Sequence, residues 1–212
     1  MRYKGIIFDL DGVICSTDAY HCQAWKAFAD RLGIYFDRNI NNRLRGISRM
    51  ASLEIVLEKS DKAYTDEEKQ AFAAEKNGLY RQLLGNMSAA DLSDEVRDTL
   101  HALRARGIKL AVGSSSKNTP YILERIGLGN FFDAVSDGNG ITRSKPDPEV
   151  FIKAAQMLDL EQAACLVVED ARAGVEAAVN GGFDAAAIGD AKDDERARWH
   201  LRRFSDLIEI VK

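Results

Sequence analysis

The sequence of 212 residues has few cysteines, no excess of positive charge and no long apolar run, and each shortage excludes a class of protein. The three cysteines, Cys15, Cys22 and Cys165, are odd in number and form no Cys-x-x-Cys pair. This argues against a disulfide framework and against a zinc site, so we expect reduced, partly buried thiols. The 29 basic and 33 acidic residues give a net charge of −4, which provides no basic surface for nucleic acid or for a membrane.

No stretch approaches the length of a membrane span, and Asp9 interrupts the apolar segment near the start, so a signal peptide is not expected either. Hydrophobic residues make up 46% of the chain, enough for one sizeable core. No internal repeat or low-complexity segment is present. We therefore expect a cytoplasmic, monomeric globular protein without a nucleic-acid or membrane partner.

The segment most informative about function is 5–13, Gly-Ile-Ile-Phe-Asp-Leu-Asp-Gly-Val. Gly5 to Phe8 are typical of a strand buried on both faces of a parallel sheet. Asp9 and Asp11 follow at the carboxyl end of this strand, where open α/β sheets bind their ligands. Two carboxylates this close repel each other unless a cation or a shared proton lies between them. The pair therefore indicates a hard-metal site or an acid/base dyad, with an ordinary turn at the end of a strand as the alternative.

Helical patterns occupy the chain from Asp18 to about Leu84, without a convincing strand. Such a stretch after the first strand predicts a small helical cap inserted into an α/β core. We place the cap at 16–87 and the core at 1–15 and 88–212. The expected cap helices are 18–32, which Asp18 can cap and Gly33 ends; 49–59, capped by Ser48; and one that ends near Leu84 and begins at a capping box of Thr65 and Glu68.

From Ser93 the chain alternates helices and strands, which predicts a doubly wound, Rossmann-like parallel sheet. The expected strands are 108–113, 132–136, 165–168 and, as the last strand, 184–188. The expected helices are 94–106, 118–126, one opened by Asp147 and Pro148, 173–180 and 206–211.

The loop after the strand 108–113 carries a run of polar residues, Ser114, Ser115, Ser116, Lys117 and Asn118. It joins a strand to the start of a helix, where hydroxyls, free backbone amides and an ammonium could hold phosphate oxygens. A solvated serine turn that caps the helix would give the same pattern.

Two other loops offer charged groups at the same edge of the predicted sheet. Glu169 and Asp170 end an apolar strand as Asp9 does, so Asp170 could meet Asp9 and complete an oxygen-ligand site for Mg²⁺. An exposed acidic turn is the alternative. Lys145 precedes Pro146 on a loop, and a single lysine there is usually a surface residue. Only the presence of the other polar motifs at the same sheet edge favours a role for Lys145 in the site.

These motifs in this order, Asp9-Leu-Asp-Gly, Ser114, Lys145-Pro and Glu169-Asp170, resemble the haloacid dehalogenase-like superfamily over the whole chain. The second aspartate of the first motif resembles the phosphotransferase branch, and the helical insertion resembles the class with a small helical cap. Within the superfamily the sequence is most similar to the β-phosphoglucomutases, through the segments 18–26, 44–49, 75–77, 114–118 and 144–146.

The resemblance implies a role for each matching residue. Asp9 would be the nucleophile and a metal ligand, Asp11 the proton carrier, and Ser114 and Lys145 would position the phosphoryl group. The metal would be Mg²⁺, with Asp9, Asp11, Glu169 and Asp170 around it. The substrate would be bound by Thr17, His21, Trp25, Gly46, Ser48, Arg49, Lys76, Ser115, Ser116, Lys117 and Asn118, among which Arg49, Ser116, Lys117 and Asn118 would hold a second, non-reacting phosphate.

Three of these residues have simpler interpretations when they are considered singly. His21 could be a packed histidine, Arg49 a charge at the surface of a helix start, and Trp25 part of the cap core. The spacing of Arg49 and His21 with Gly46 and Ser48 favours a functional role for both.

The activity implied is that of an isomerase that interconverts β-D-glucose 1-phosphate and glucose 6-phosphate through an aspartyl phosphate and glucose 1,6-bisphosphate, with a phosphorylated hexose as substrate. A Mg²⁺-dependent sugar-phosphate phosphatase and a non-catalytic phosphosugar-binding protein are the alternatives. The chain departs from the family pattern at Cys15-Ser16, where Thr-Asp is common, at Ala171, where serine is frequent, and before Val96, where Pro-Gly is usual. The first departure lies near the cap hinge and bears on the balance between mutase and phosphatase, and the second bears on the surroundings of the metal.

Overall fold

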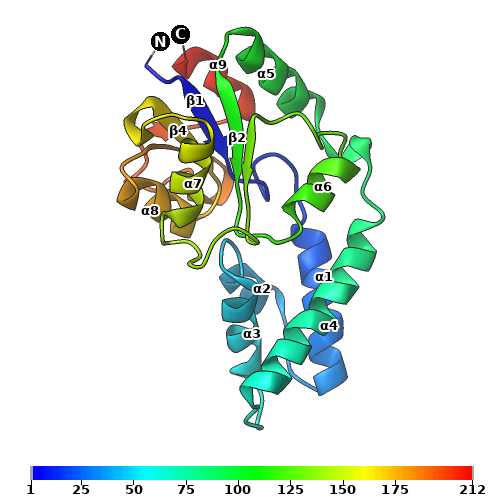
Figure 1. The fold of residues 1–212 in the computed structure, drawn as a ribbon. Coiled ribbons are helices and arrows are strands. Elements are labelled where there is room, and N and C mark those ends of the chain that lie inside the picture. Colours follow the sequence, from blue (N-terminus) through cyan, green and yellow to red (C-terminus); the bar gives the residue numbers. More distant parts are fainter. Residues whose placement is uncertain (1, 212) are drawn as a thin grey trace.

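In the computed structural model, which describes residues 2–211, an α/β core lies above a group of helices (Figure 1). The six strands of the described chain form one parallel sheet in the order β3-β2-β1-β4-β5-β6. The central strand β1 (Gly5–Phe8) pairs with β2 (Lys109–Gly113) and β4 (Cys165–Glu169). The outer strands are β3 (Ala134–Ser136), β5 (Asp184–Ala187) and β6 (Trp199–His200). The predicted doubly wound sheet is confirmed.

Helices cover both faces of the sheet, which explains why its central strands are apolar along their whole length. Ile6 and Phe8 pack in one hydrophobic cluster with residues of α5 (Asp94–Ala105), α6 (Thr119–Arg125) and α9 (Leu207–Ile210). Ile7 points to the opposite face and packs in a cluster with α7 (Glu149–Met157) and α8 (Arg172–Asn180). Figure 1 shows α7 and α8 together on one side of the sheet.

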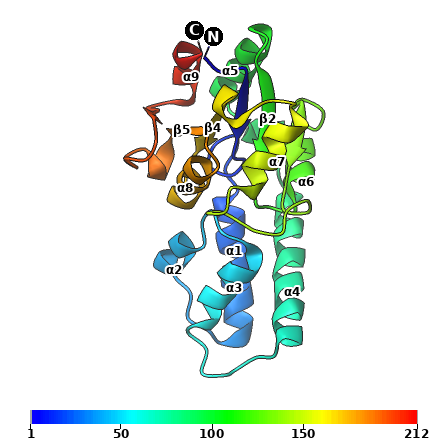
Figure 2. The same cartoon turned by 60° about the vertical axis from the view of Figure 1, so that its left-hand side comes forward.

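The cap is built from α1 (Asp18–Leu32), α2 (Arg38–Arg43), α3 (Arg49–Leu57) and α4 (Asp66–Leu84), which lie below the sheet in both views (Figures 1 and 2). Much of its apolar surface is buried in a cluster of its own, around Trp25, Phe28, Leu53 and Val56. The exact division into a core of 1–15 and 88–212 and a cap of 16–87 stays a prediction.

Where the sequence predicted an element, the structure has one whose ends lie within two residues of the prediction. The capping box of α4 is confirmed: the Glu68 amide donates to Thr65 Oγ1 at 3.2 Å, and the Thr65 amide donates to the Glu68 carboxylate at 2.8 Å. Gly33 ends α1 in the left-handed conformation, with a φ of 71°. Short 3₁₀ turns, absent from the prediction, span Ala89–Asp91, Gln162–Ala164, Gly189–Ala191 and Phe204–Asp206.

Three details of the prediction were wrong. The helix α2 was not expected, because six residues are too few for a clear helical pattern in the sequence. The side chain of Asp37 caps its start. The strand β6 has two residues and follows β5, which is therefore not the last strand. Asp18 does not cap α1 but is its first residue, and Thr17 is the N-cap residue.

The burial of the cysteines differs in part from the expectation of partly buried thiols. All three cysteines are free; Cys22 is half-buried, while Cys15 and Cys165 are fully rather than partly buried. In the part of the chain that the structure describes, no helix is long and apolar enough to cross a membrane.

Candidate active site

Three carboxylates meet at the carboxyl ends of β1 and β4. Asp9, Glu169 and Asp170 each offer an oxygen, and these oxygens lie within 4.8 Å of one another. They meet because Phe8 pairs with Val168 in the parallel register, so the residues that follow the two strands are neighbours. All three side chains are buried, which makes this acidic cluster costly without positive charge nearby.

The loop after β1 approaches the cluster closely because residue 12 is glycine. Gly12 has a φ of +85°, and a Cβ atom there would lie 2.1 Å from Asp170 Oδ2. The glycine of the Asp-x-Asp-Gly motif is thus needed both for the left-handed backbone and for the room it leaves to Asp170.

Lys145 supplies a fixed positive charge to the cluster. Its ammonium forms ion pairs with both Asp9 and Glu169, and its side chain is 1% exposed. Burial disfavours the charged amine, but the two carboxylates outweigh it and raise the pKa of Lys145 above its usual value. Lys145 therefore stays protonated at neutral pH.

The acidic cluster fits a hard divalent cation, because it offers only oxygen ligands. Burial raises the pKa of Asp170 to about 8, and the charges of Asp9 and Glu169 add to this shift. A cation bound among these groups would relieve the repulsion. The carboxylate of Asp11 is not part of the cluster, so Asp11 could contribute to a metal site only through its backbone carbonyl.

Asp11 is instead held by the residue that precedes α1. The Thr17 amide donates to Asp11 Oδ1 at 2.7 Å, and the Thr17 hydroxyl donates to Asp11 Oδ2 at 2.6 Å. Burial raises the pKa of Asp11 to about 6, although the hydrogen bonds from Thr17 oppose the shift. A carboxyl group with this pKa can both accept and return a proton near neutral pH.

A cavity of about 520 Å³ connects this edge of the sheet with the cap. The structure brings nearly all the predicted site residues to its walls. The core contributes Asp9, Asp11, Ser114, Ser115, Ser116, Lys117, Asn118, Lys145 and Asp170, and the cap contributes His21, Trp25, Gly46, Ser48, Arg49 and Lys76. Thr17 and Glu169 are not in the wall and contact Asp11 and Lys145 respectively.

A buried lysine and a half-buried histidine of the cap form a pair in this wall. Lys76 Nζ lies 2.9 Å from His21 Nδ1 and 4.6 Å from the ring centres of both Trp25 and Tyr80. Burial lowers the pKa of Lys76 to about 7, helped by the charge of Arg49. Burial and the charges of Lys76 and Arg49 lower the pKa of His21 well below its usual value, so the imidazole is neutral.

Arg49 and Lys117 line the cavity as cations that bind no other side chain of the described residues, whereas Lys76 lacks an acidic partner but contacts His21. Within residues 2–211, the guanidinium of Arg49 and the ammonium of Lys117 make neither an ion pair nor a hydrogen bond, whereas Arg45 and Lys145 are paired with carboxylates. The two unpaired charges come from different parts of the fold, α3 and the loop between β2 and α6. They are available to an anionic ligand.

Ser48 and Trp25 have structural contacts in addition to their place in the wall. The Ser48 hydroxyl accepts the Ala51 amide at 3.2 Å and so caps α3, as the sequence predicts. Trp25 is 2% exposed and packs edge-on against Phe28, in agreement with a role in the cap core.

Sequence reasoning missed the cavity residues Arg45, Asn77 and Tyr80. Arg45 donates to Asp170 Oδ2 at 3.3 Å and forms an ion pair with Asp190, so it joins the cap to the core. Asn77 accepts a hydrogen bond of 2.9 Å from the Asn118 amide group. Their partners lie far away in the sequence, and no local pattern indicates such contacts.

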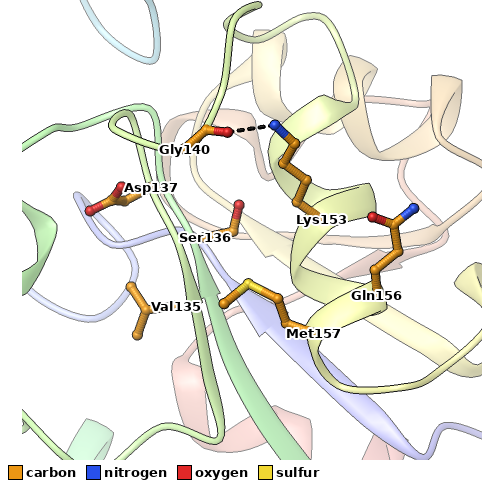
Figure 3. Close-up of a pocket in the computed structure, with 7 residues that line it drawn as sticks. All are labelled: Val135, Ser136, Asp137, Gly140, Lys153, Gln156 and Met157. Carbon is orange, nitrogen blue, oxygen red and sulfur yellow. Dashed lines mark hydrogen bonds between the residues drawn. The ribbon is translucent and has the colours of Figure 1, made fainter.

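A second cavity, of about 440 Å³, lies between the edge strand β3 and α7 (Figure 3). Lys153 crosses it and donates to the Gly140 carbonyl, and the side chains of Gln156 and Met157 line its other wall. None of the predicted site residues lines this cavity, so the chemistry is expected at the first one.

The comparisons with known proteins agree with this geometry. The model of the haloacid dehalogenase-like hydrolase family matches residues 3–182. The chain is 40% identical over 206 residues to the β-phosphoglucomutase of Bacillus subtilis, covering 96% of this chain and 91% of the relative. It is 31% identical over 188 residues to a fructose-1-phosphate phosphatase of Escherichia coli, covering 88% and 97%. A crystal structure of β-phosphoglucomutase from Clostridium difficile superposes with a TM-score of 0.92 at 33% identity, covering 99% of this chain and 95% of that one.

Proposed function

The chain belongs to the haloacid dehalogenase-like hydrolase family, and within that family we propose that it is a β-phosphoglucomutase, which interconverts β-D-glucose 1-phosphate and glucose 6-phosphate. One observation carries the proposal: the cavity that holds the acidic cluster also contains two cations, Arg49 and Lys117, whose charged groups make neither an ion pair nor a hydrogen bond within residues 2–211. A mutase must hold a bisphosphate, so it needs positive groups for a phosphate that does not react. The proposal includes a monomer that acts in the cytoplasm.

The cavity offers a place to each end of such a substrate. We assign the reacting phosphoryl group to Asp9, Ser114 and Lys145, because Asp9 is the buried carboxylate next to the fixed charge of Lys145. The second phosphate is assigned to Arg49, Lys117 and the neighbouring polar groups of Ser116 and Asn118. The sugar would lie between them, against His21, Trp25, Gly46, Ser48, Lys76 and Ser115, with Thr17 behind Asp11.

The reaction starts from the enzyme phosphorylated on Asp9. The 6-hydroxyl of β-D-glucose 1-phosphate attacks the phosphorus, Asp11 takes the hydroxyl proton, and Asp9 leaves as a carboxylate. The product, glucose 1,6-bisphosphate, then binds in the reversed orientation. Asp9 attacks its 1-phosphate, Asp11 returns the proton to the departing sugar oxygen, and glucose 6-phosphate leaves.

Charge placement accounts for most of the catalysis in such a transfer. Lys145 is held between Asp9 and Glu169, so its charge faces the phosphoryl oxygens without reorganisation. Asp9, Asp170 and the backbone carbonyl of Asp11 would hold Mg²⁺, with Glu169 beside the site. The ion would supply further positive charge to the phosphoryl oxygens. The cap covers the cavity and limits the access of water to the aspartyl phosphate.

A Mg²⁺-dependent sugar-phosphate phosphatase is the second candidate, because the chain is also 31% identical to a fructose-1-phosphate phosphatase. In that reaction water attacks the phosphate on Asp9 in place of the sugar hydroxyl. The same groups would be used, and only the exclusion of water would differ.

The two candidates are separated by following β-D-glucose 1-phosphate by ³¹P NMR with Mg²⁺ and a catalytic amount of glucose 1,6-bisphosphate. We expect glucose 6-phosphate to accumulate. Stoichiometric release of inorganic phosphate without glucose 6-phosphate would refute the mutase. Asp9→Asn serves as the control, since a non-catalytic phosphosugar-binding protein would show the same lack of turnover with and without this substitution.

A further inference from the structure

The loop that carries Lys145 is held by an acidic residue that the mechanism above does not use. Between β3 and α7, residues 137–148 form neither a helix nor a strand, and Lys145 lies near the end of this segment. Glu149 follows the loop as the first residue of α7, and its side chain is only 12% exposed. A long irregular loop needs anchors of this kind if it is to hold one side chain in a fixed place.

One carboxylate oxygen of Glu149 accepts three hydrogen bonds from this loop. The Thr142 amide and the Thr142 hydroxyl each donate to Glu149 Oε2 at 3.0 Å, and the Arg143 amide donates to the same oxygen at 2.7 Å. Arg143 lies two residues before Lys145. The backbone that leads into Lys145 is therefore fixed by a side chain of α7.

A lysine one turn further along α7 holds the same loop at a second point. Lys153 Nζ donates to Glu149 Oε1 at 2.6 Å, and it also donates to the carbonyl of Gly140 (Figure 3). The hydrogen bonds from Lys153 and from the loop amides lower the pKa of Glu149 to about 2, so the carboxylate stays ionised at neutral pH.

The carboxylate of Glu149 is not needed to satisfy the start of its own helix. The amide of Glu149, one of the free amides at the start of α7, donates to Asp147 Oδ1 at 3.0 Å. The helix is itself fixed on the sheet, because Val150, Phe151 and Ala154 are fully buried. The carboxylate is thus free for the loop, and it projects from a rigid support.

The ammonium of Lys145 has to be placed accurately. It forms ion pairs with Asp9 and Glu169 and lies 4.8 Å from the centre of the ring of Phe151, another residue of α7. Because the lysine side chain is 1% exposed, a shift of the loop would leave two buried carboxylates without their cation. The same helix therefore fixes Lys145 at its backbone, through the loop, and at its ammonium, through the ring.

We propose that Glu149 is a positioning residue for Lys145: it holds the loop so that the Lys145 ammonium reaches Asp9. The inference rests on the proposed function only in that Asp9 is phosphorylated and Lys145 faces the phosphoryl group. It applies to a mutase and to a phosphatase alike.

The test follows phosphorylation of Asp9 by acetyl phosphate, whose leaving group needs no proton, in single-turnover experiments with Mg²⁺. Glu149→Ala removes the anchor of the loop and should slow this step at least tenfold, because Lys145 is no longer held at Asp9. Glu149→Gln keeps an oxygen that can accept from the loop amides, so it should slow the step less than threefold.

A double variant and a matched control separate positioning from a general loss of structure. In the Lys145→Ala background the loop has no ammonium to place, so the further change Glu149→Ala should alter the residual rate less than twofold. The control is Glu95→Ala. Glu95 lies in the first turn of α5, outside the cavity wall, and accepts the amide and the hydroxyl of Ser205 at 3.0 and 2.8 Å. Its loss should leave the rate unchanged.

Four results would refute the inference: an unchanged rate in Glu149→Ala, the same loss in both backgrounds, Glu149→Gln as slow as Glu149→Ala, or an equal loss in Glu95→Ala. A wild type that forms the aspartyl phosphate but makes no glucose 6-phosphate would refute the proposed function and leave this comparison valid. A wild type that acetyl phosphate does not phosphorylate would refute both.

Discussion

Replacement of Lys76 by methionine should stabilise the protein at neutral pH while it slows the reaction. Lys76 is 2% exposed, and burial lowers its pKa from 10.5 to about 7. An unfolded chain binds a proton at this lysine up to about pH 10.5, whereas the folded protein loses it near pH 7. Between these values the unfolded state binds more protons, so the stability of the wild type should rise as the pH rises.

The size of the effect follows from the shift. A difference of about 3.5 pKa units, at 1.36 kcal/mol for each, penalises the folded state by about 4 kcal/mol at pH 7. Methionine has a similar length and can contact the Trp25 and Tyr80 rings through its sulfur. His21 Nδ1 loses its partner at 2.9 Å, which costs about 1–2 kcal/mol. The net gain at pH 7 is therefore about 2–3 kcal/mol, and near pH 10.5 the variant should be no more stable than the wild type.

Urea unfolding followed by circular dichroism from pH 6 to pH 10.5 measures the gain in stability at pH 7 and its loss near pH 10.5. Lys69→Met is the control: this lysine of the same helix pairs with Glu54 at the surface, and its loss should change the free energy of unfolding by less than about 1 kcal/mol at every pH. The reasoning would be refuted if Lys76→Met were less stable than the wild type at pH 7, or if the difference in free energy of unfolding did not depend on pH. Either result would show that burial does not lower the pKa of Lys76.

Three further predictions concern the reaction and the cap. Because the pKa of Asp11 is raised to about 6, its base form is lost below that pH. We therefore expect kcat/KM for the sugar phosphate to fall below pH 6, while the rate of phosphorylation by acetyl phosphate does not. The same pH dependence for both reactions would contradict the role of Asp11. Arg49→Ala should slow mutase turnover at least tenfold and largely spare aspartyl-phosphate formation from acetyl phosphate, and equal loss of both would refute its role with the second phosphate. Asp190→Asn should release the Arg45 ion pair and make tryptic cleavage within 44–48 about two- to fivefold faster, with the exposed Asp193→Asn as control; equal rates in both variants would show that the pair does not hold the cap.

The framework of this protein could be predicted because it depends on neighbours in the chain. The strand before Asp9 is marked by its unbroken apolar run, the start of α4 by the spacing of Thr65 and Glu68, and the end of α1 by Gly33. Parallel strands with helices between them then place their carboxyl ends at one edge of the sheet. The meeting of Asp9 with Asp170 follows from that topology, and it was predicted for this reason.

The prediction was weakest where a residue has two local choices. Thr17 has the right type and position to cap α1, and no local pattern indicates that its hydroxyl turns to Asp11 instead. The short helix α2 and the strand β6 of two residues are held mainly by the surfaces they pack against. Such features are decided by contacts that form only in the folded protein, such as the pairing of β6 with β5.

The sequence by itself determined the order of the elements and the chemical groups at the ends of the strands, because hydrophobic periodicity and capping are local properties. The tertiary structure alone decided which of these groups are charged and which are paired. Lys145 is held between Asp9 and Glu169, Lys76 is buried against aromatic rings, and Arg49 has no acidic partner in the described chain. Burial and distance between charges set such properties, and both depend on residues that are far apart in the sequence.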